Sequence, residues 1–507
     1  MTEVTSHKRI AKNTIALYVR GIISVIIGLY TSRVIIDTLG VNDYGLYGVA
    51  GGFVGILAFL NSAMSGATSR FITFEMGLGD MERTKNTFAN TLTVHVAIAV
   101  TVFVVCELVG VWFLNTQLNI PEESLSAANW VFQLSILTAA VNITQVPYTA
   151  LIISHERMNV YAYMEIVNVT LKLVIVYFLL VIPGNKLIVY AVLTAAIGLG
   201  VAMAYRIYCL KHFHESRTGL KYNKDILRPI LKFSGWDLYG NMCAVFRTQG
   251  TTFLLNIFFG VAINGAAAIA TQLNGTISGF SNNVATAVRP QIIKNYAQKN
   301  WSQFQHLLEF GCQASFILLA MMVVPLFLEA HYVIKLWLGE VPEYVVTFLR
   351  IILLTAMFNQ MVAIVNIGIH ATGRIKSISF ISGSLCIIAL VIIYMFFRMG
   401  YDSPAAFYII MASMGLILVI NLFILKNLVK EIDLLRIFLK LLILPLICLP
   451  AAVGCVALHF TQMPAFIRLM AVCVCSVALI GAMTVVFILN KEQRAGLIRK
   501  LTHRGVR

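Results

Sequence analysis

The chain has 507 residues, of which 59% are hydrophobic and 12% charged, and its formal net charge is +16 at pH 7. Its polar stretches are short connections, so no soluble catalytic domain fits between the apolar segments, and nearly the whole chain is predicted to lie in a membrane. The basic residues sit next to the ends of apolar segments, which favours anionic lipid headgroups over nucleic acid as their partner.

Fourteen apolar segments follow one another, each long enough to cross about 30 Å of hydrocarbon as a helix. We place them at 10–36, 42–67, 88–114, 124–153, 159–183, 187–210, 231–258, 263–287, 303–328, 343–369, 377–397, 404–425, 437–460 and 465–489. Most Lys and Arg fall in every second connection, and the remaining connections and the span edges beside them hold only Lys186, Lys335, Arg398 and Arg468. By the positive-inside rule, both termini are predicted to be cytoplasmic. The predicted fold class is an all-α integral membrane protein with 14 transmembrane helices.

The first span carries one polar stripe. Asn13, Arg20, Ser24 and Thr31 fall within about 40° of one another at 100° per residue. Such a stripe predicts one wall of a wet cavity. The alternative is that Arg20 pairs with a carboxylate or extends to the inner headgroups. Asp37, at the outer end of this span, is a weaker candidate for binding a coupling ion.

The inner connections 70–87 and 289–302 mix apolar residues with bases. This pattern predicts short helices that lie in the headgroup plane.

The third to fifth spans hold further polar residues. Glu107, in the third, is a candidate for ion coupling. The fifth places Glu165 and Lys172 seven residues apart on one face, with Asn168 between them. Mutual neutralisation of the two charges is the favoured interpretation, and coupling of a proton or cation is the alternative.

An internal repeat relates the two halves of the chain. LGVNDYGLYGVA (39–50) aligns with FGVAINGAAAIA (259–270), and each stretch joins the first two spans of a set of six. An even number of spans makes the repeats parallel, and transporters built in this way bind substrate between their halves. The predicted domains are an N-lobe (1–216), a C-lobe (217–432), and 433–507 with spans 13 and 14 and a basic tail.

The seventh span leads the second repeat as the first span leads the first. Asp237, Asn241 and Thr248 share one face, and Gly240, Arg247 and Thr251 share an adjacent one. Because about 15 Å of helix rise separates Asp237 from Arg247, the two are not expected to pair. A mid-span guanidinium stays protonated and offers a planar fork of donors that suits phosphate or carboxylate. We therefore predict a cationic cavity between the lobes, lined by Arg20, Ser24, Thr31, Asn241, Arg247 and Thr251.

The sequence lacks the motifs that catalysis, metal binding or phosphate binding by a glycine loop would need. The nine cysteines stand without metal-ligand spacing, and neither a phosphate-cradling glycine loop nor a nucleophile–His constellation is present. The sequence therefore predicts a protein that is not an enzyme and that binds no metal or cofactor.

Three stretches carry a resemblance to a known family. They are RIAKNTIALYVRGIISVIIGLYTSRVIIDTLGVNDYGLYGVAGG (9–52), FRTQGTTFLLNIFFGVAINGAAAIATQLNG (246–275) and AVRPQIIKNYAQKN (287–300). Together with the 14-span layout, they resemble the O-antigen-type (Wzx-like) flippases for polysaccharide biosynthesis, in the multidrug/oligosaccharidyl-lipid/polysaccharide (MOP) exporter superfamily.

The resemblance implies two six-helix, MATE-like lobes around a central cavity in the bacterial inner membrane. It implies that an undecaprenyl-pyrophosphate-linked oligosaccharide moves from the cytoplasmic to the outer leaflet by alternating access, for surface polysaccharide assembly. Arg20 and Arg247 match the cationic residues that receive the pyrophosphate in such proteins. A proton or sodium gradient would drive transport, and the implied partners are membrane lipids and a polysaccharide polymerase or glycosyltransferases.

Two other functions are alternatives. A cation-coupled multidrug exporter of the MATE type would line its cavity with carboxylates such as Glu107 or Glu165 and keep the arginines elsewhere. An integral-membrane glycosyltransferase or polymerase would need a large outer loop or an acidic catalytic pair. The longest outer connection, of about fifteen residues after the ninth span, argues against that second alternative.

Overall fold

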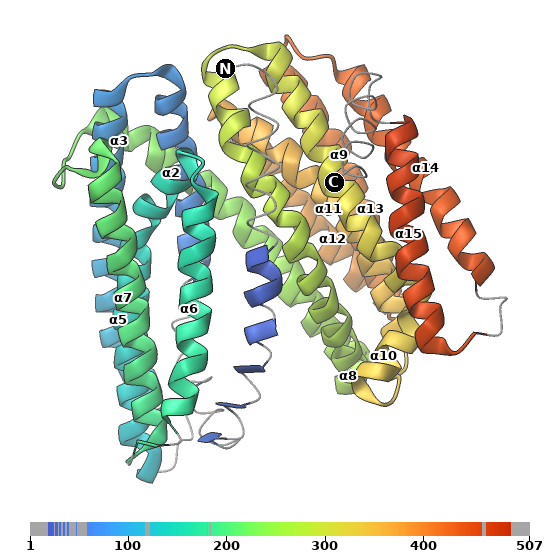
Figure 1. Cartoon of the computed structure of the whole chain (residues 1–507), viewed down its shortest axis with the longest axis horizontal. Helices are drawn as coiled ribbons and strands as arrows, with labels where there is room; N and C mark the ends of the chain where they lie inside the picture. Colours follow the sequence, from blue (N-terminus) through green and yellow to red (C-terminus); the bar gives the residue numbers. More distant parts are fainter. Residues whose placement is uncertain are drawn as a thin grey trace, which may run out of the picture. The chain divides into compact units, whose positions relative to one another are not determined.

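The computed structural model describes residues 19–24, 26–28, 30–31, 34–35, 38–39, 47, 58–116, 122–179, 181–182, 184–458 and 463–487. Within these residues the chain is almost wholly helical and contains no strand. The main helices (Figure 1) are α2 (Ala58–Leu78), α3 (Met81–Val105), α4 (Val111–Thr116), α5 (Glu122–Ser154), α6 (Met158–Phe178), α7 (Lys186–His212), α8 (Lys224–Ala297), α9 (Trp301–Leu328), α10 (Ala330–Leu338), α11 (Val345–Thr372), α12 (Lys376–Arg398), α13 (Ala405–Leu428), α14 (Leu434–Ala457) and α15 (Ala465–Phe487). A π-helical turn, η1 (Cys106–Gly110), joins α3 to α4, and a 3-10 turn, η2 (His214–Ser216), follows α7.

Ten membrane-spanning candidates stand out among the described helices by length and apolar composition. They coincide with the third to sixth and the ninth to fourteenth predicted spans. The chain is therefore a multi-pass integral membrane protein, which confirms the predicted all-α membrane class. The total of fourteen spans, the two parallel lobes and the domain boundaries after residues 216 and 432 stay predictions.

The seventh and eighth predicted spans both lie in α8, which Gly260 divides. Gly260 has φ 81° and ψ −176° inside the otherwise helical segment. A positive φ is strained for residues with a Cβ and costs glycine little, so glycine suits a sharp turn between two helices. This glycine belongs to the predicted repeat, and its counterpart Gly40 lies outside the described residues.

Several helices begin at a side chain that caps the free backbone amides. Asp80 Oδ1 accepts from the Arg83 amide at 2.9 Å, and Asp433 Oδ1 accepts from the Arg436 amide at 3.1 Å. Asn185 and Asn223 cap α7 and α8 in the same way. Each cap stabilises a helix start by about 1 kcal/mol and fixes where the connection ends.

The first compact unit comprises 1–242, 287–300 and 370–380. Within it α5 packs against α2, α3 and α7, and α6 packs against α7 (Figure 1). The core of this bundle includes Ile72, Phe88, Leu151 and Cys209, all buried. The segments predicted to lie on the cytoplasmic side are in contact here. For example, Lys221 Nζ donates to Asn86 Oδ1 at 2.9 Å.

The second unit comprises 243–286, 301–369 and 381–507. Its helices α9, α14 and α15 pack against one another (Figure 1). Polar side chains join α11, α12 and α13, because Asn421 donates to Asn366 Oδ1 at 2.9 Å and accepts from Ser382 at 2.9 Å. Such amides hold helices together in a medium that offers no water.

The prediction of headgroup-plane helices at 70–87 and 289–302 was wrong. Residues 70–78 continue α2, residues 289–297 continue α8, and only Gly79 and Asp80 separate α2 from α3. Ile72 and Ile292 are fully buried, and the Phe74 and Tyr296 rings lie 6.4 Å apart. The apolar residues of the two segments therefore pack within the protein, because an amphipathic pattern fits a protein surface as well as a lipid surface.

Candidate functional site

Arg20 lies in the first unit, in a helical stretch that includes residues 19–24. Its guanidinium carbon lies 5.1 Å from the centre of the Tyr161 ring on α6. Arg20 and Glu165 both lie close enough to the Tyr205 hydroxyl to act on it electrostatically. The aromatic face stabilises the cation through a cation–π contact.

Two hydroxyls of the predicted stripe are buried. Thr31 is 8% exposed, and neither its Oγ1 nor the Oγ of Ser24 has a hydrogen-bond partner among the described residues. A buried hydroxyl without a partner costs about 1–3 kcal/mol, so these two hydroxyls are costly polar groups on an otherwise apolar segment.

Arg247 lies in the second unit, in the first half of α8. It is half-buried, and its Nη1 contacts the sulfur of Met414 on α13 at 3.7 Å. In the described part of the chain, no carboxylate forms an ion pair with this guanidinium. A thioether is a weak hydrogen-bond acceptor, so the contact with Met414 uses little of the donor capacity of the Arg247 guanidinium.

Thr251 and Asn241 are the other predicted site residues of α8. The Thr251 hydroxyl donates to the Arg247 backbone carbonyl at 2.7 Å, so its proton is already engaged. Asn241 is half-buried. The meeting of Arg20 and Arg247 across one cavity stays a prediction.

Asp237 and Arg247 do not pair with each other, as their separation along the helix predicted. Asp237 Oδ1 instead lies 3.8 Å from His370 Nε2, at the end of α11. The His370 ring meets the Phe233 ring edge to face at 5.4 Å. The carboxylate nearest to Arg247 in sequence is therefore engaged elsewhere.

The candidates for ion coupling have different surroundings. Glu107 Oε2 accepts from Gln133 Nε2 at 3.0 Å, which links η1 to α5. Glu165 and Lys172 are both half-buried on α6, and no ion pair joins them within the described residues. Asp37 lies outside the described residues. The assignment of these groups to ion coupling stays a prediction.

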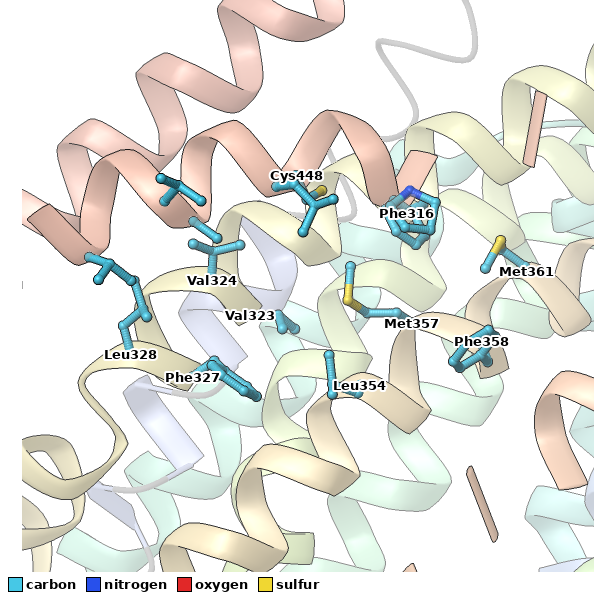
Figure 2. Close-up of a pocket in the computed structure, with 15 residues that line it drawn as sticks. Phe316, Val323, Val324, Phe327, Leu328, Leu354, Met357, Phe358, Met361 and Cys448 are labelled. Carbon is cyan, nitrogen blue, oxygen red and sulfur yellow. The ribbon is translucent and has the colours of Figure 1, made fainter. Parts of the chain in front are cut away.

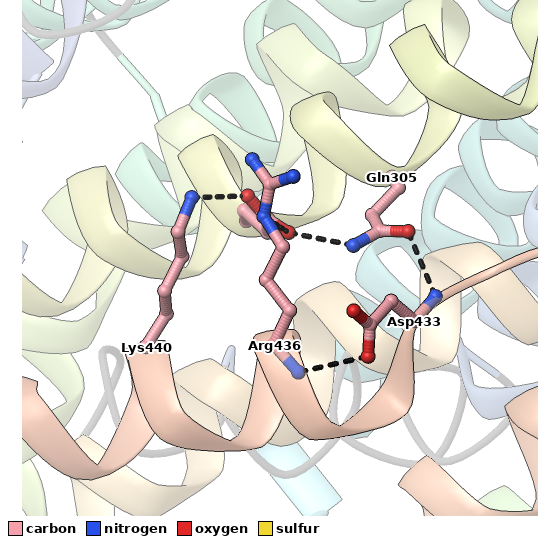
Figure 3. A network of polar contacts seen from close by, with 5 residues as sticks. Gln305, Asp433, Arg436 and Lys440 are labelled. Carbon is pink, nitrogen blue, oxygen red and sulfur yellow. Dashed lines mark hydrogen bonds and ion pairs between the residues drawn. The ribbon is translucent and has the colours of Figure 1, made fainter. Parts of the chain in front are cut away.

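Sequence reasoning missed a charged network between α9 and α14 (Figure 3). The Glu309 side chain is 1% exposed and forms ion pairs with Lys440 and with Arg436, whose Nε lies 3.3 Å from Oε1. Gln305 Nε2 donates to Glu309 Oε1 at 2.8 Å and its Oε1 accepts from the Asp433 amide at 2.9 Å. The available signal was an ionisable residue, Glu309, inside a predicted span.

A second missed pair joins α9 to α15 at the opposite end of α9. Arg468 donates twice to Glu329, from Nε at 2.8 Å and from Nη2 at 3.0 Å. This two-bond geometry is the strongest that arginine and a carboxylate form. The buried carboxylates of Glu309, in α9, and of Glu329, just after α9, are thus neutralised locally and are not available to a cargo.

An apolar pocket of about 490 Å³ lies in the second unit between α9, α11 and α14 (Figure 2). Its wall includes Val323 and Phe327 from α9, Leu354 and Phe358 from α11, and Cys448 from α14. No charged side chain lines it. Such a pocket accepts hydrocarbon and excludes ions.

The chain was compared with known proteins by sequence and by structure. The profile of the family described as "Polysaccharide biosynthesis protein" matches residues 10–296. The search of curated proteins by sequence found no match.

Solved structures share the fold. A crystal structure of MATE in complex with MaD3S superposes with a TM-score of 0.72 at 14% identity, covering 84% of this chain and 97% of that one. The outward-facing multidrug resistance MATE transporter of the MOP superfamily gives a TM-score of 0.70 at 13% identity, covering 83% and 97%. A MOP superfamily transporter from Pyrococcus furiosus gives a TM-score of 0.67 at 14% identity, covering 86% and 96%.

The structural matches establish a MATE-like fold, and the family match covers more than half of the sequence. The chain therefore belongs to the polysaccharide biosynthesis protein family.

Proposed function

We propose that the protein moves an undecaprenyl-pyrophosphate-linked oligosaccharide from the cytoplasmic to the outer leaflet of a bacterial inner membrane, for surface polysaccharide assembly. The observation that carries the proposal is the state of Arg247. It is a half-buried guanidinium with a thioether contact and no carboxylate partner in the described residues. A permanent charge held inside a membrane protein at a cost of about 2.5–3.5 kcal/mol is usually retained for function.

The chemistry of the cargo matches these groups. A pyrophosphate entering a low-dielectric cavity loses its water, and fixed guanidinium donors replace that water with charge-assisted hydrogen bonds. Arg20, held against Tyr161, supplies the second donor group in the proposal. The apolar pocket between α9, α11 and α14 suits a lipid chain. A sugar carried without a lipid would not use such a pocket.

Replacing either arginine tests the proposal. Arg20→Ala and Arg247→Ala should each lower export by about 10- to 100-fold, because a hydrogen bond to a charged group contributes about 1.5–3 kcal/mol. Lysine at either position should restore part of the export, since it keeps the charge but loses the planar fork. The measurement is surface polysaccharide in cells that lack the chromosomal gene and carry each variant.

The matched control is Arg398→Ala. Arg398 lies exposed at the end of α12 over the Tyr394 ring, outside the proposed cavity. This variant should export as the wild type does, and all variants should be present in the membrane at equal amounts. Wild-type export by both Arg20→Ala and Arg247→Ala would refute the role of the two arginines.

The MATE-type multidrug exporter remains the second candidate because solved MATE transporters share the fold. It predicts that loss of Glu165 or Glu107 abolishes export of cationic drugs while the arginine variants keep it. The reverse result favours the anionic lipid.

A further inference from the structure

Contacts at the predicted cytoplasmic ends of the helices join segments from the two predicted lobes. All lie within the first compact unit. The segments from the N-lobe are the end of α2 and the turn between α5 and α6. Those from the C-lobe are the end of α8, 287–297, and the junction of α11 with α12, 370–373.

The first contact centres on Arg70. Arg70 is 7% exposed, and its guanidinium carbon lies 4.5 Å from the Phe71 ring centre and 4.6 Å from that of Phe74. Its Nη2 donates to the Ala371 carbonyl at 3.1 Å. Gly373 has φ +73°, and a Cβ there would lie 2.7 Å from Arg70 Nη2. The arginine thus satisfies a helix-end carbonyl that would otherwise need water.

The second contact centres on Glu156, which is 5% exposed in the turn between α5 and α6. Its Oε1 accepts from Lys294 Nζ at 3.0 Å and its Oε2 accepts from Gln291 Nε2 at 2.7 Å. Both partners lie on the last turns of α8.

Glycines allow the backbones to approach at these crossings. A Cβ on Gly77 would lie 2.9 Å from the Ala297 Cβ and 3.0 Å from the Lys294 Cα. A Cβ on Gly66 would lie 3.3 Å from Asp237 Oδ2, the carboxylate whose other oxygen faces His370. Small residues at helix crossings allow close packing without a large apolar surface.

We propose that these contacts form an inner latch, defined by Arg70, Glu156, Lys294, Ala371 and the glycines beside them. The latch closes the cytoplasmic side of the transporter and opens when cargo loads. Its charged groups can be hydrated when they separate, so the open state replaces each lost contact with water. An apolar interface of the same size would expose hydrocarbon on opening. This inference rests on the transporter fold and on the lobe arrangement within the proposed function, and it is independent of the identity of the cargo.

A reversible cross-link tests whether the latch must open. In Gly77→Cys/Ala297→Cys the two Cβ atoms start 2.9 Å apart, closer than the roughly 3.5–4.5 Å of a disulfide, so the helices must separate by about 1 Å to permit the bond. Oxidation should abolish export and reductant should restore it. The control is Thr73→Cys/Ser154→Cys, where the native hydroxyls lie 2.6 Å apart between α2 and α5 of the same lobe. Its disulfide should leave export unchanged.

A second cysteine pair provides the test if Gly77→Cys prevents folding at this tightly packed position. Glu156→Cys/Lys294→Cys, bridged by a short bis-methanethiosulfonate that forms a disulfide with each cysteine, should also block export until thiol reductant cleaves the two disulfides. Export by either bridged latch pair at the level of its reduced form would overturn the latch.

A labelling experiment that needs no cargo tests the latch separately from the proposed function. A single Ala297→Cys reporter, in a background with Cys473 and Cys475 replaced by Ala, is alkylated with a maleimide in membranes; the other seven cysteines are buried. Glu156→Ala should speed alkylation at least about tenfold, because the buried Lys294 contact is lost. An unchanged rate would overturn the latch, whereas a faster rate without any polysaccharide phenotype would leave the latch standing and remove the proposed cargo.

Discussion

Buried carboxylates in this protein are met by basic side chains from other helices. Glu156 meets Lys294, Glu309 meets Lys440 and Arg436, and Glu329 meets Arg468. Arg247 differs from these basic partners, since its contact is the sulfur atom of Met414 and no carboxylate pairs with it among the described residues. This mid-span guanidinium is the residue that points most strongly to an anionic cargo.

His155 and Glu215 make a pair whose effect depends on pH. The imidazole lies 3.3 Å from the carboxylate and stacks on Phe213 at 4.1 Å. The nearby His155 lowers the pKa of Glu215, while burial of the carboxyl works in the opposite direction. A carboxylate with a lowered folded pKa stabilises the fold above its unfolded pKa of about 4.3, and this stabilisation is lost as pH falls through the folded pKa.

We therefore predict that Glu215→Gln lowers the apparent melting temperature near pH 6 and that the difference from the wild type disappears as pH falls below about 4. Thermal unfolding of the purified protein in detergent, measured across pH, checks this. Glu82→Gln, at an exposed site in the first turn of α3, is the control and should show no such dependence. A difference that persists or grows at acid pH would contradict the pairing.

At the scale of the element, two ion pairs attach α14 and α15 to α9. Glu309 binds α14 near one end of α9, and Glu329, just after its other end, binds α15. We predict that Glu309→Gln destabilises the protein by about 2 kcal/mol. This is less than the roughly 3–5 kcal/mol of a fully buried pair, because Lys440 and Arg436 can turn toward water. Thermal unfolding should show a lower midpoint, with loss of contact between α14 and α9 first.

The control is Glu122→Gln, an exposed carboxylate in the first turn of α5. It should unfold with the wild type. A charge exchange, Glu309→Lys with Lys440→Glu, should recover part of the stability. If Glu309→Gln unfolds at the wild-type temperature, the network does not hold α14 in place.

Element boundaries were largely predictable from sequence, and contacts between elements were not. The apolar run predicted at 124–153 is helical over Glu122–Ser154, because about twenty apolar residues must span the hydrocarbon whatever surrounds them. The segments 70–87 and 289–302 were misassigned, because amphipathicity does not reveal which surface covers the apolar face. Tyr161 as the neighbour of Arg20, and Lys440 as the partner of Glu309, depend on tertiary packing between residues far apart in sequence.

The candidate site was predictable only in part. Mid-span polar residues such as Arg247 stand out against the apolar background, so their functional weight can be argued from sequence. The engagement of the Thr251 hydroxyl by the Arg247 carbonyl, and of Asp237 by His370, required coordinates.

Three features of the whole molecule belong together in the proposal. They are Arg20 and Arg247, an apolar pocket that suits a lipid chain, and an inner latch whose polar contacts can be exchanged for water. The latch lies in the first compact unit and the pocket in the second, each unit holds one of the two arginines, and transport in the proposal couples them. The fold is shared with multidrug transporters. The fold therefore does not decide between the lipid-linked oligosaccharide and the multidrug proposals, and the identity of the cargo does.

The most direct measurement is therefore mass spectrometry of lipid-linked intermediates in cells that lack the gene, with and without complementation. We predict that an undecaprenyl-pyrophosphate glycan accumulates in the deletion and in the Arg20→Ala/Arg247→Ala strain, and that the wild type and Arg398→Ala clear it. A deletion strain with no accumulated pyrophosphate-linked glycan and with normal surface polysaccharide would show that the protein does not carry this lipid.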